Sequence, residues 1–357
     1  MMTLSRCSLC SLLVLAAIAL LFCARSEAEG FGPSVDVVDG LTFKVEALPV
    51  KGFMIGRDTT KGTFFLLSQI EYKKGLKDVY FDDRYLVQEV SLKGVVVNKW
   101  PIKLMSGGID VTDTTYALSP NHCSFAYFDW EKKSIRVLDI TTGADEEVIG
   151  GLGAGIARLR WLSEAQFIFL DHGRHKNPPQ VDKLIKVRLP DKEVDVLYEM
   201  KEWYSLMSLA VAPGGRLVAF ADWRNPGPDL RATTREITEE EFPMQVLLDV
   251  ETKEAKDLGR SWGSTCWSAD GRQLAYFGGH GEITVYSVAD QTTRVIATRK
   301  RRVCDMVFIG NSYLLWVYEG ETRPIRYDLN KNEQTVAPHE IGTGWWRPFG
   351  ETLILAN

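Results

Sequence analysis

Acidic and aromatic side chains recur at one position in this sequence, directly after short apolar runs. The runs "FAYFDW", "FIFLDH" and "VAFADW" end on Asp followed by a ring, while "YFGGH" and "LWVYE" end on His and Glu. Carboxylates beside aromatic planes suit the recognition of sugars or polar peptides. An Asp at such a place also caps a turn through its own backbone, and both interpretations stay open. The residues concerned are Asp129, Trp130, Asp171, His172, Asp222, Trp223, His280 and Glu319.

Two long polar segments follow two of these runs, at residues 172–183 and 223–243. They add His175 and Arg224 to the candidate ligand or partner face. Loops that exceed what neighbouring strands need are more often functional than structural, although surface insertions are also tolerated. Histidine is a common metal ligand, but the chain has five His and none has the spacing of a known metal motif. We therefore predict no metal and no other cofactor.

No catalytic constellation stands out. The segment "GGLGAGIA" at 150–157 comes directly after an apolar strand, as a dinucleotide-binding loop would. That fingerprint needs a helix next, but the chain continues with "RLRWLSEAQFIFL", another pair of strands. A Gly-x-Ser-x-Gly pattern occurs as "GRSWG" at residues 259–263, but the first strand of the next repeat unit follows it, where a nucleophile elbow needs a helix. Whether the protein is an enzyme is left open by the sequence, and no catalytic residue is predicted.

The elements that must position these residues form a repeat. From Ala117 onward, a unit of about 40 to 45 residues recurs: a short apolar strand, a polar turn, a nearly continuous apolar strand, a loop and two further strands. Four strands per unit at this period are the signature of propeller blades. Stacked blades bury both faces of their inner strands, which explains the continuous apolar runs.

The repeated phrase resembles the TolB-type, WD-repeat-like propeller family. The segments that carry the resemblance are "SPNHCSFAYF", "APGGRLVAF" and "SADGRQLAYF", which match the family's Ser-Pro-Asp-Gly turn and apolar strand. The resemblance implies a fold and says almost nothing about function. A related group, the oligogalacturonate lyases, uses a His cluster for a metal, which makes His172, His175 and His280 the positions to inspect.

The two ends of the chain each supply half a blade. We expect residues 343–357 to pair with residues 34–48 and to close the ring, which removes exposed sheet edges. Five clear blades span residues 115–338, and a less regular one spans residues 49–105. The sequence therefore predicts an all-β, seven-bladed β-propeller of four-stranded antiparallel blades, with six blades as the alternative.

The N-terminus carries an export signal. Arg6 precedes a short apolar run, and small residues occur near Ala28, which is the pattern of a cleaved signal peptide at residues 1–28. A lipoprotein anchored at Cys23 is the second interpretation, and an uncleaved N-terminal anchor is the third. We expect residues 29–357 to form one propeller domain, exported to the periplasm or the extracellular space, with no membrane span after signal removal.

Charge and cysteine content narrow the partners. The net charge is −5, and the run "RKRR" at 299–302 has no aromatic interleaving, so a nucleic-acid partner is not expected. The mature chain keeps Cys123, Cys266 and Cys304, which we expect to be free and buried. We predict a binding or scaffold module that holds a protein or a polar ligand, such as a carbohydrate, on its loop-rich face. The alternative is a carbohydrate lyase or hydrolase.

Overall fold

Every element in the described part of the computed structural model is a β-strand. The described residues are 34–42, 44–58, 60–69, 72–74, 79–81, 84–103, 115–129, 131–152, 156–172, 181–200, 208–224, 241–299, 301–341, 345–349 and 352–356. The predicted signal peptide and Cys23 lie outside these residues. No helix in this part of the chain is long and apolar enough to cross a membrane.

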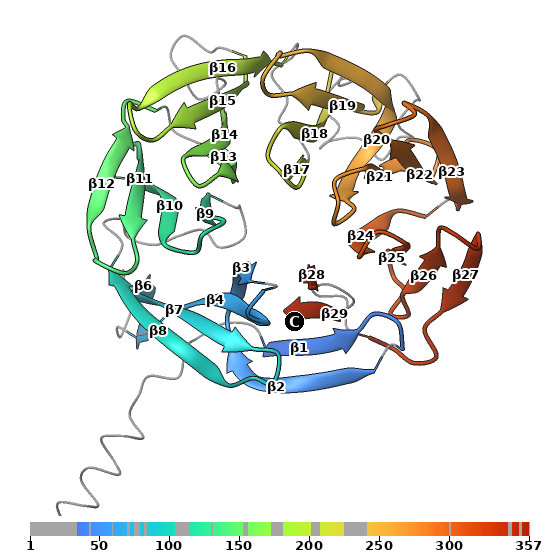
Figure 1. Ribbon diagram of the computed structural model, residues 1–357, viewed down its shortest axis with the longest axis horizontal. Helices are drawn as coiled ribbons and strands as arrows, with labels where there is room; N and C mark the ends of the chain where they lie inside the picture. The colour runs from blue at the N-terminus through green and yellow to red at the C-terminus, as the bar shows by residue number, and fades with distance from the viewer. Residues whose placement is uncertain are drawn as a thin grey trace, which may run out of the picture.

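Four-stranded antiparallel sheets stand side by side in a ring (Figure 1). One sheet holds β3 (Phe53–Asp58), β4 (Thr63–Gln69), β7 (Arg84–Ser91) and β8 (Val96–Lys103). The next holds β9 (Tyr116–Leu118), β10 (Ser124–Asp129), β11 (Ser134–Asp139) and β12 (Asp145–Ile149). A third holds β13 (Ile156–Ser163), β14 (Gln166–Asp171), β15 (Lys183–Arg188) and β16 (Glu193–Glu199). The predicted all-β ring of four-stranded antiparallel sheets is confirmed.

A seven-stranded sheet comes next along the chain. It contains β17 (Leu209–Val211), β18 (Leu217–Asp222), β19 (Met244–Asp249), β20 (Ala255–Trp267), β21 (Gln273–Gly278), β22 (Glu282–Ser287) and β23 (Thr293–Thr298). Another four-stranded sheet contains β24 (Val303–Ile309), β25 (Tyr313–Tyr318), β26 (Ile325–Asp328) and β27 (Glu333–Val336). The short strands β5 (Tyr72–Lys74) and β6 (Val79–Phe81) form a separate hairpin between β4 and β7.

The two ends of the chain share one sheet. Its order is β2 (Val45–Lys51), β1 (Ser34–Asp39), β29 (Thr352–Ala356) and β28 (Trp345–Phe349). Strand β1 pairs antiparallel with β29 over the register from Val35–Ala356 to Asp39–Thr352. Residues from both termini thus complete the ring with backbone hydrogen bonds, and the edges that an open ring would expose are paired.

The second strand of each unit is buried on both faces. Strands β10, β14, β18, β21 and β25 share one burial pattern, in which only the first residue is partly exposed. Outer strands such as β16 and β27 are mostly exposed. The continuous apolar runs in the sequence therefore mark strands that lie between two neighbouring sheets.

Hydrophobic clusters join each sheet to the next. Ile168 and Leu170 of β14 pack with Val218 and Phe220 of β18. Similar clusters lie between the other neighbouring sheets, and one joins Val38 of β1 to the strands of the last sheet. Burial of this kind contributes roughly 25 cal/mol per Å² of apolar surface, and it holds the ring together without disulfides.

The inner turns of neighbouring units contact one another at one end of the ring, called the turn end here. It comprises residues 60–62, 119–123, 212–216 and 268–272. The Ala269 amide donates to the Gly310 carbonyl oxygen at 3.1 Å, and a Cβ on Gly215 would lie 2.0 Å from the Leu162 carbonyl oxygen. The backbone at Gly215 also has a φ of 76°, which favours glycine. Position 215 therefore requires glycine, because a side chain would be strained there and would clash with Leu162.

The three described cysteines are free, and the prediction that all are buried is wrong. Cys123 and Cys304 are exposed, and Cys266 is partly buried. Cys123 lies in the β9–β10 turn, and Cys304 lies beside a bulge in β24. Both positions interrupt the regular alternation of side chains, so the burial expected from strand periodicity does not apply to them.

Candidate functional site

Three of the predicted acids lie at equivalent places in three neighbouring sheets. Asp129, Asp171 and Asp222 end β10, β14 and β18, and all three are buried. These strand ends define the loop end of the ring, because an antiparallel strand that starts at the turn end finishes at the opposite one. The sequence placed these residues correctly in one structural row, but their carboxylates point into protein.

Asp129 caps its own turn. Its Oδ1 accepts hydrogen bonds from the backbone N–H groups of Glu131 and Lys132, each at 3.0 Å. This is the turn-capping interpretation that the sequence left open. Trp130, predicted beside it, lies outside the described residues. The part of Asp129 and Trp130 in binding a ligand stays a prediction.

Asp222 belongs to a buried ionic network with Arg224. The Arg224 Nε donates to Asp222 Oδ2 at 2.8 Å, and its two Nη atoms donate to the Asp257 carboxylate at 2.6 and 2.7 Å. The Tyr198 hydroxyl also donates to Asp222 Oδ2, at 2.8 Å. Charge-assisted, two-pronged contacts of this kind are among the strongest hydrogen bonds in proteins.

The ionisation of this network is set by its contacts. The hydrogen bond to Asp257 raises the pKa of Arg224 above its usual value, with a further contribution from Asp222. Burial raises the pKa of Tyr198 to about 12, and the negative charge of Asp222 adds to this effect. Tyr198 is thus a neutral hydrogen-bond donor, and Arg224 is a fixed cation, throughout the physiological range.

His172 makes a second buried pair at the loop end. Its Nδ1 lies 3.0 Å from Asp182 Oδ2, and both side chains are buried. The two residues flank the predicted loop: His172 comes directly after β14, and Asp182 directly precedes β15. His175 and the rest of residues 173–180 lie outside the described residues.

The two pairs occupy matching places on adjacent sheets. His172 and Asp182 close the base of the loop between β14 and β15. Arg224, held to Asp222 and Asp257, fixes the start of the connection from β18 to β19, of which residues 225–240 lie outside the described residues. Each long loop therefore leaves the ring from a base that buried polar contacts hold in place.

The remaining candidates are spread around the ring. Trp223 is partly exposed beside Arg224. His280 and Glu319 are exposed in the β21–β22 and β25–β26 connections, and the His280 amide donates to Glu282 Oε2 at 3.0 Å. The structure brings Asp222, Trp223 and Arg224 together. It leaves His172 and His280 on sheets with β17–β20 between them (Figure 1).

The described residues do not fit a metal centre. Among them, no three His, Cys, Asp or Glu side chains gather as a metal ion requires. His172 already directs Nδ1 at Asp182, and His280 belongs to a different sheet. We derive no chemical step through a metal.

A cavity of about 680 Å³ lies at the centre of the ring and was not foreseen from the sequence. Its wall comes from the innermost strands β3, β9, β13, β17 and β20, together with the β9–β10 turn. Pockets of this volume are typical of small-ligand sites. The charged or titratable side chains on its wall are Arg57, His122 and Arg160, together with the phenol of Tyr116.

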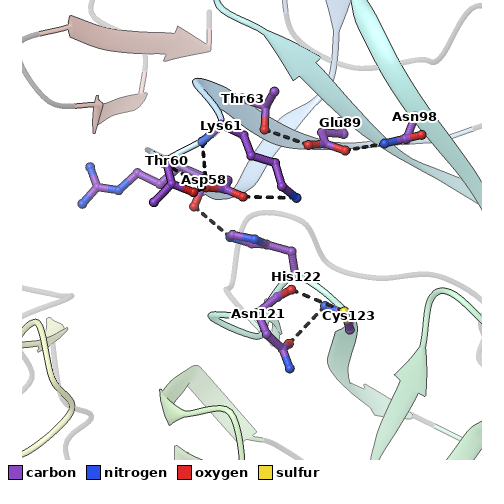
Figure 2. A network of polar contacts seen from close by, with 10 residues as sticks. Asp58, Thr60, Lys61, Thr63, Glu89, Asn98, Asn121, His122 and Cys123 are labelled. Carbon is purple, nitrogen blue, oxygen red and sulfur yellow. Dashed lines mark hydrogen bonds and ion pairs between the residues drawn. The ribbon is translucent and has the colours of Figure 1, made fainter.

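His122 joins the β9–β10 turn to β3. Its Nε2 lies 2.8 Å from the Arg57 carbonyl oxygen, and its ring stacks on Phe65 with centroids 4.4 Å apart. Figure 2 shows the ring directed from its turn toward the Asp58–Lys61 turn. Burial lowers the pKa of His122 below its usual value, so the ring is neutral at pH 7 and donates from Nε2.

The acids around His122 are held by their own partners. Asp58 accepts from Thr60 Oγ1 at 2.6 Å, and this bond lowers the pKa of Asp58 to about 2. Glu89 accepts from Thr63 Oγ1 at 2.8 Å and from Asn98 Nδ2 at 2.6 Å (Figure 2). Neither carboxylate is part of the cavity wall.

The sequence held one signal for this cavity. His122 has a φ of 62°, which is the left-handed conformation, and it stands where the related turn at residue 271 has Gly. A bulky residue in that conformation is strained and often functional. The presence of His in "SPNHCS", where the related turn has Gly, therefore marks this turn in the sequence.

Comparisons with known proteins support the fold alone. No family model and no curated protein matches the chain. An oligogalacturonate lyase solved in complex with manganese superposes with a TM-score of 0.57 at 14% identity, covering 91% of this chain and 89% of that one. TolB from Acinetobacter baumannii gives 0.43 at 14% identity, covering 89% and 65%, so this chain spans less than two thirds of it. A nidogen/laminin complex gives 0.45 at 12% identity, covering 77% and 93%. The superposition on the lyase, together with the ring of four-stranded sheets, confirms the predicted propeller resemblance at the level of fold.

Proposed function

We propose that this protein is an exported β-propeller that binds a protein or a polar ligand, such as a carbohydrate, on the loop end of its ring. The observation that carries the proposal is the pair of fixed loop bases on adjacent sheets, His172 with Asp182 and Arg224 with Asp222 and Asp257. A rigid scaffold that presents long loops is the usual construction of a recognition surface.

The energetics favour a functional role for these loops. Ordering or closing a long loop reduces conformational entropy, and a ring does not need such loops to close. The connection from β21 to β22 manages with a few residues between Gly278 and Glu282. Burying charged groups to hold a loop base is also unfavourable unless their geometry is good, so the arrangement is consistent with selection for a presented surface.

We further propose that the ring has seven blades. In support, β20 is 13 residues long and pairs with β19 through its first half and with β21 through its second half. Residues of β18 and β19 also pack against β21 and β22, so the two halves of the seven-stranded sheet face each other as neighbouring blades do. A crystal structure would test this count directly.

Export is part of the same proposal. Its support is the N-terminal pattern of a basic residue, a short apolar run and small residues before Glu29. Cleavage after Ala28 predicts a mature chain that begins at Glu29. Intact-mass measurement of protein purified from a periplasmic fraction or culture medium checks this, and a mass that includes an N-terminal lipid on Cys23 supports the lipoprotein alternative.

The carbohydrate lyase or hydrolase remains the alternative function. It requires a set of acid and base residues around a bound sugar. Among the described residues, His172 is paired with Asp182, and Asp129, Asp171 and Asp222 are buried. Elimination or hydrolysis of an acidic or neutral glycan by the purified protein would favour this alternative over a binding role.

The test replaces the β18–β19 loop. A variant with residues 225–240 exchanged for a Gly-Ser linker and with Trp223→Ala keeps Arg224 and its partners, so we expect its melting temperature to match the parent. Binding to glycans on an array, or to a partner captured from the exported fraction, should fall at least tenfold. The control is Arg272→Gln at the turn end. Unchanged binding by a folded loop variant contradicts the proposal.

A further inference from the structure

The charged side chains on the described part of the central cavity's wall are all of one sign. They are Arg57 and Arg160, beside the neutral ring of His122, and this part of the wall contains no Asp or Glu. The chain as a whole has a net charge of −5, so this wall departs from the average of the molecule. A concave, low-dielectric site lined by one sign of charge concentrates ligands of the opposite sign.

Arg57 lines the cavity in a partly desolvated setting. The residue is exposed on the cavity side, yet surrounding protein lowers the pKa of its guanidinium below the usual value through burial. Arginine stays charged at any physiological pH. An anion that binds beside it offsets the loss of hydration, and its backbone is fixed by the contact from His122 Nε2 to the Arg57 carbonyl oxygen.

A bulge directs Arg160 to the same cavity. In β13, the pairing passes from Ala157–Leu170 to Arg160–Ile168, so Arg158 and Leu159 share one partner position. Arg158 has a φ of 59°, which is unfavourable for a side chain of this size. Bulges of this kind redirect side chains near functional sites. Arg160 donates from Nη1 to the Leu159 carbonyl oxygen at 2.7 Å, which orients the guanidinium on the cavity wall.

The rest of the wall is largely apolar. Met54 and Ile55 come from β3, Leu118 from β9, and Leu209 and Val211 from β17. Strand β3 packs closely against β9 at Gly56, where a Cβ would lie 2.8 Å from Leu118 Cδ2. The wall therefore combines two guanidinium groups with a hydrocarbon surface, the composition of a site for an organic anion rather than for a bare ion.

We propose that the central cavity binds a small organic anion, with its carboxylate or phosphate held by Arg57 and Arg160 and its apolar body against Met54, Leu118 and Leu209. Guanidinium groups match the geometry of both head groups through paired N–H donors. His122 acts as a positioning residue, since it holds the backbone of Arg57. This site lies at the turn end and does not depend on the loop-end function.

The test uses calorimetric titration of the mature full chain at pH 7.5. The probes are 4-bromobenzoate and phenyl phosphate, with 4-bromobenzamide as the neutral counterpart. We expect at least one anion to bind saturably at one site and at least tenfold more tightly than the amide, and the tighter anion identifies the head group. The variant Arg57→Gln/Arg160→Gln should lose at least tenfold in affinity, whereas Arg272→Gln, an exposed arginine in the equivalent turn at 268–272, should match the parent.

Two results overturn the proposal. One is binding of both anions no tighter than the amide, and the other is parent affinity in a folded double variant. If the double variant does not fold, a crystal of the parent soaked in 4-bromobenzoate decides. Anomalous scattering should place bromine inside the cavity, and bromine found only elsewhere contradicts the assignment.

Discussion

Arginines at the two ends of this ring have opposite surroundings. At the loop end, Arg224 is held by two carboxylates and a tyrosine hydroxyl, so its charge is neutralised within the protein. At the turn end, Arg57 and Arg160 line a cavity whose described wall carries no acid. The same side chain therefore stabilises structure in one region and borders a ligand-sized cavity in the other.

The difference shows that residue type and strand position do not decide function. Arg224 looked like a ligand contact in the sequence because it begins a long polar segment, and the structure shows it bound to Asp222 and Asp257. Arg57 and Arg160 looked ordinary because each lies within a strand. What separates the two cases is the surroundings of the guanidinium group: Arg224 binds Asp222 and Asp257, whereas Arg57 and Arg160 belong to the wall of a cavity.

The largest effect on stability should come from opening the ring, because both the turn end and the loop end depend on its closure. Deleting residues 350–357 removes β29, the strand that pairs with both β1 and β28. Because the closing sheet loses its middle, we expect most of the free energy of unfolding to be lost. Chemical denaturation followed by circular dichroism measures this. Deletion of Asn357 alone is the control, and a strand-deletion variant as stable as the parent would show that closure is not structural.

Arg224→Met should give the next largest effect. Asp222 is fully buried, and it would lose its cation while keeping only the Tyr198 hydroxyl. Breaking a buried ion pair in this way costs about 3 kcal/mol of stability. The control is Arg272→Met, whose side chain is 81% exposed and should change stability by less than about 0.5 kcal/mol. Equal, small effects of both variants would mean that Arg224 is not structural.

Acidification should affect the turn end through His122. Burial lowers the pKa of His122, so the unfolded chain takes up this proton first as the pH falls. Stability should therefore be highest above pH 6.5 and decline as the pH drops from there to the folded-state pKa. The variant His122→Asn tolerates the left-handed backbone and should remove this part of the pH dependence. Denaturation midpoints of both proteins between about pH 7.5 and 5 test this, and identical slopes contradict it.

The smallest effect on stability should come from Arg57→Gln. Arg57 lines the cavity, and glutamine keeps hydrogen-bonding capacity there while it relieves the desolvation of a charge. We expect the free energy of unfolding without ligand to change by less than about 0.5 kcal/mol. A loss comparable to that of Arg224→Met would place Arg57 among the structural arginines and end the contrast between the two regions.

Much of the fold was predictable from the sequence, because its pattern is local and repeated. The apolar runs around Phe125, Phe167 and Phe220 correspond to the doubly buried strands β10, β14 and β18. The pairing of the chain ends was predictable from two half-units at residues 34–48 and 343–357. The hairpin β5–β6 and the continuous strand β20 were not predicted, since neither produces a periodic pattern of apolar residues in the sequence.

The candidate site was less predictable, for a physical reason. The row of Asp129, Asp171 and Asp222 was identified correctly, because repeat position is a local property. Whether each carboxylate faces solvent depends on partners far away in sequence, such as Asp257 for Arg224. The cavity arises from five separate strands, and only the left-handed His122 marked it in one stretch of sequence.

Hydrogen exchange with a bound partner tests the central claim, that the loop end is the recognition surface, most directly. The mature chain is compared free and in complex with the glycan or protein recovered in the binding experiment, and peptides are monitored by mass spectrometry. The account predicts protection in peptides covering residues 172–182 and 223–243, with no change at 268–272. Protection confined to the turn end, with residues 172–182 and 223–243 unchanged, would contradict it.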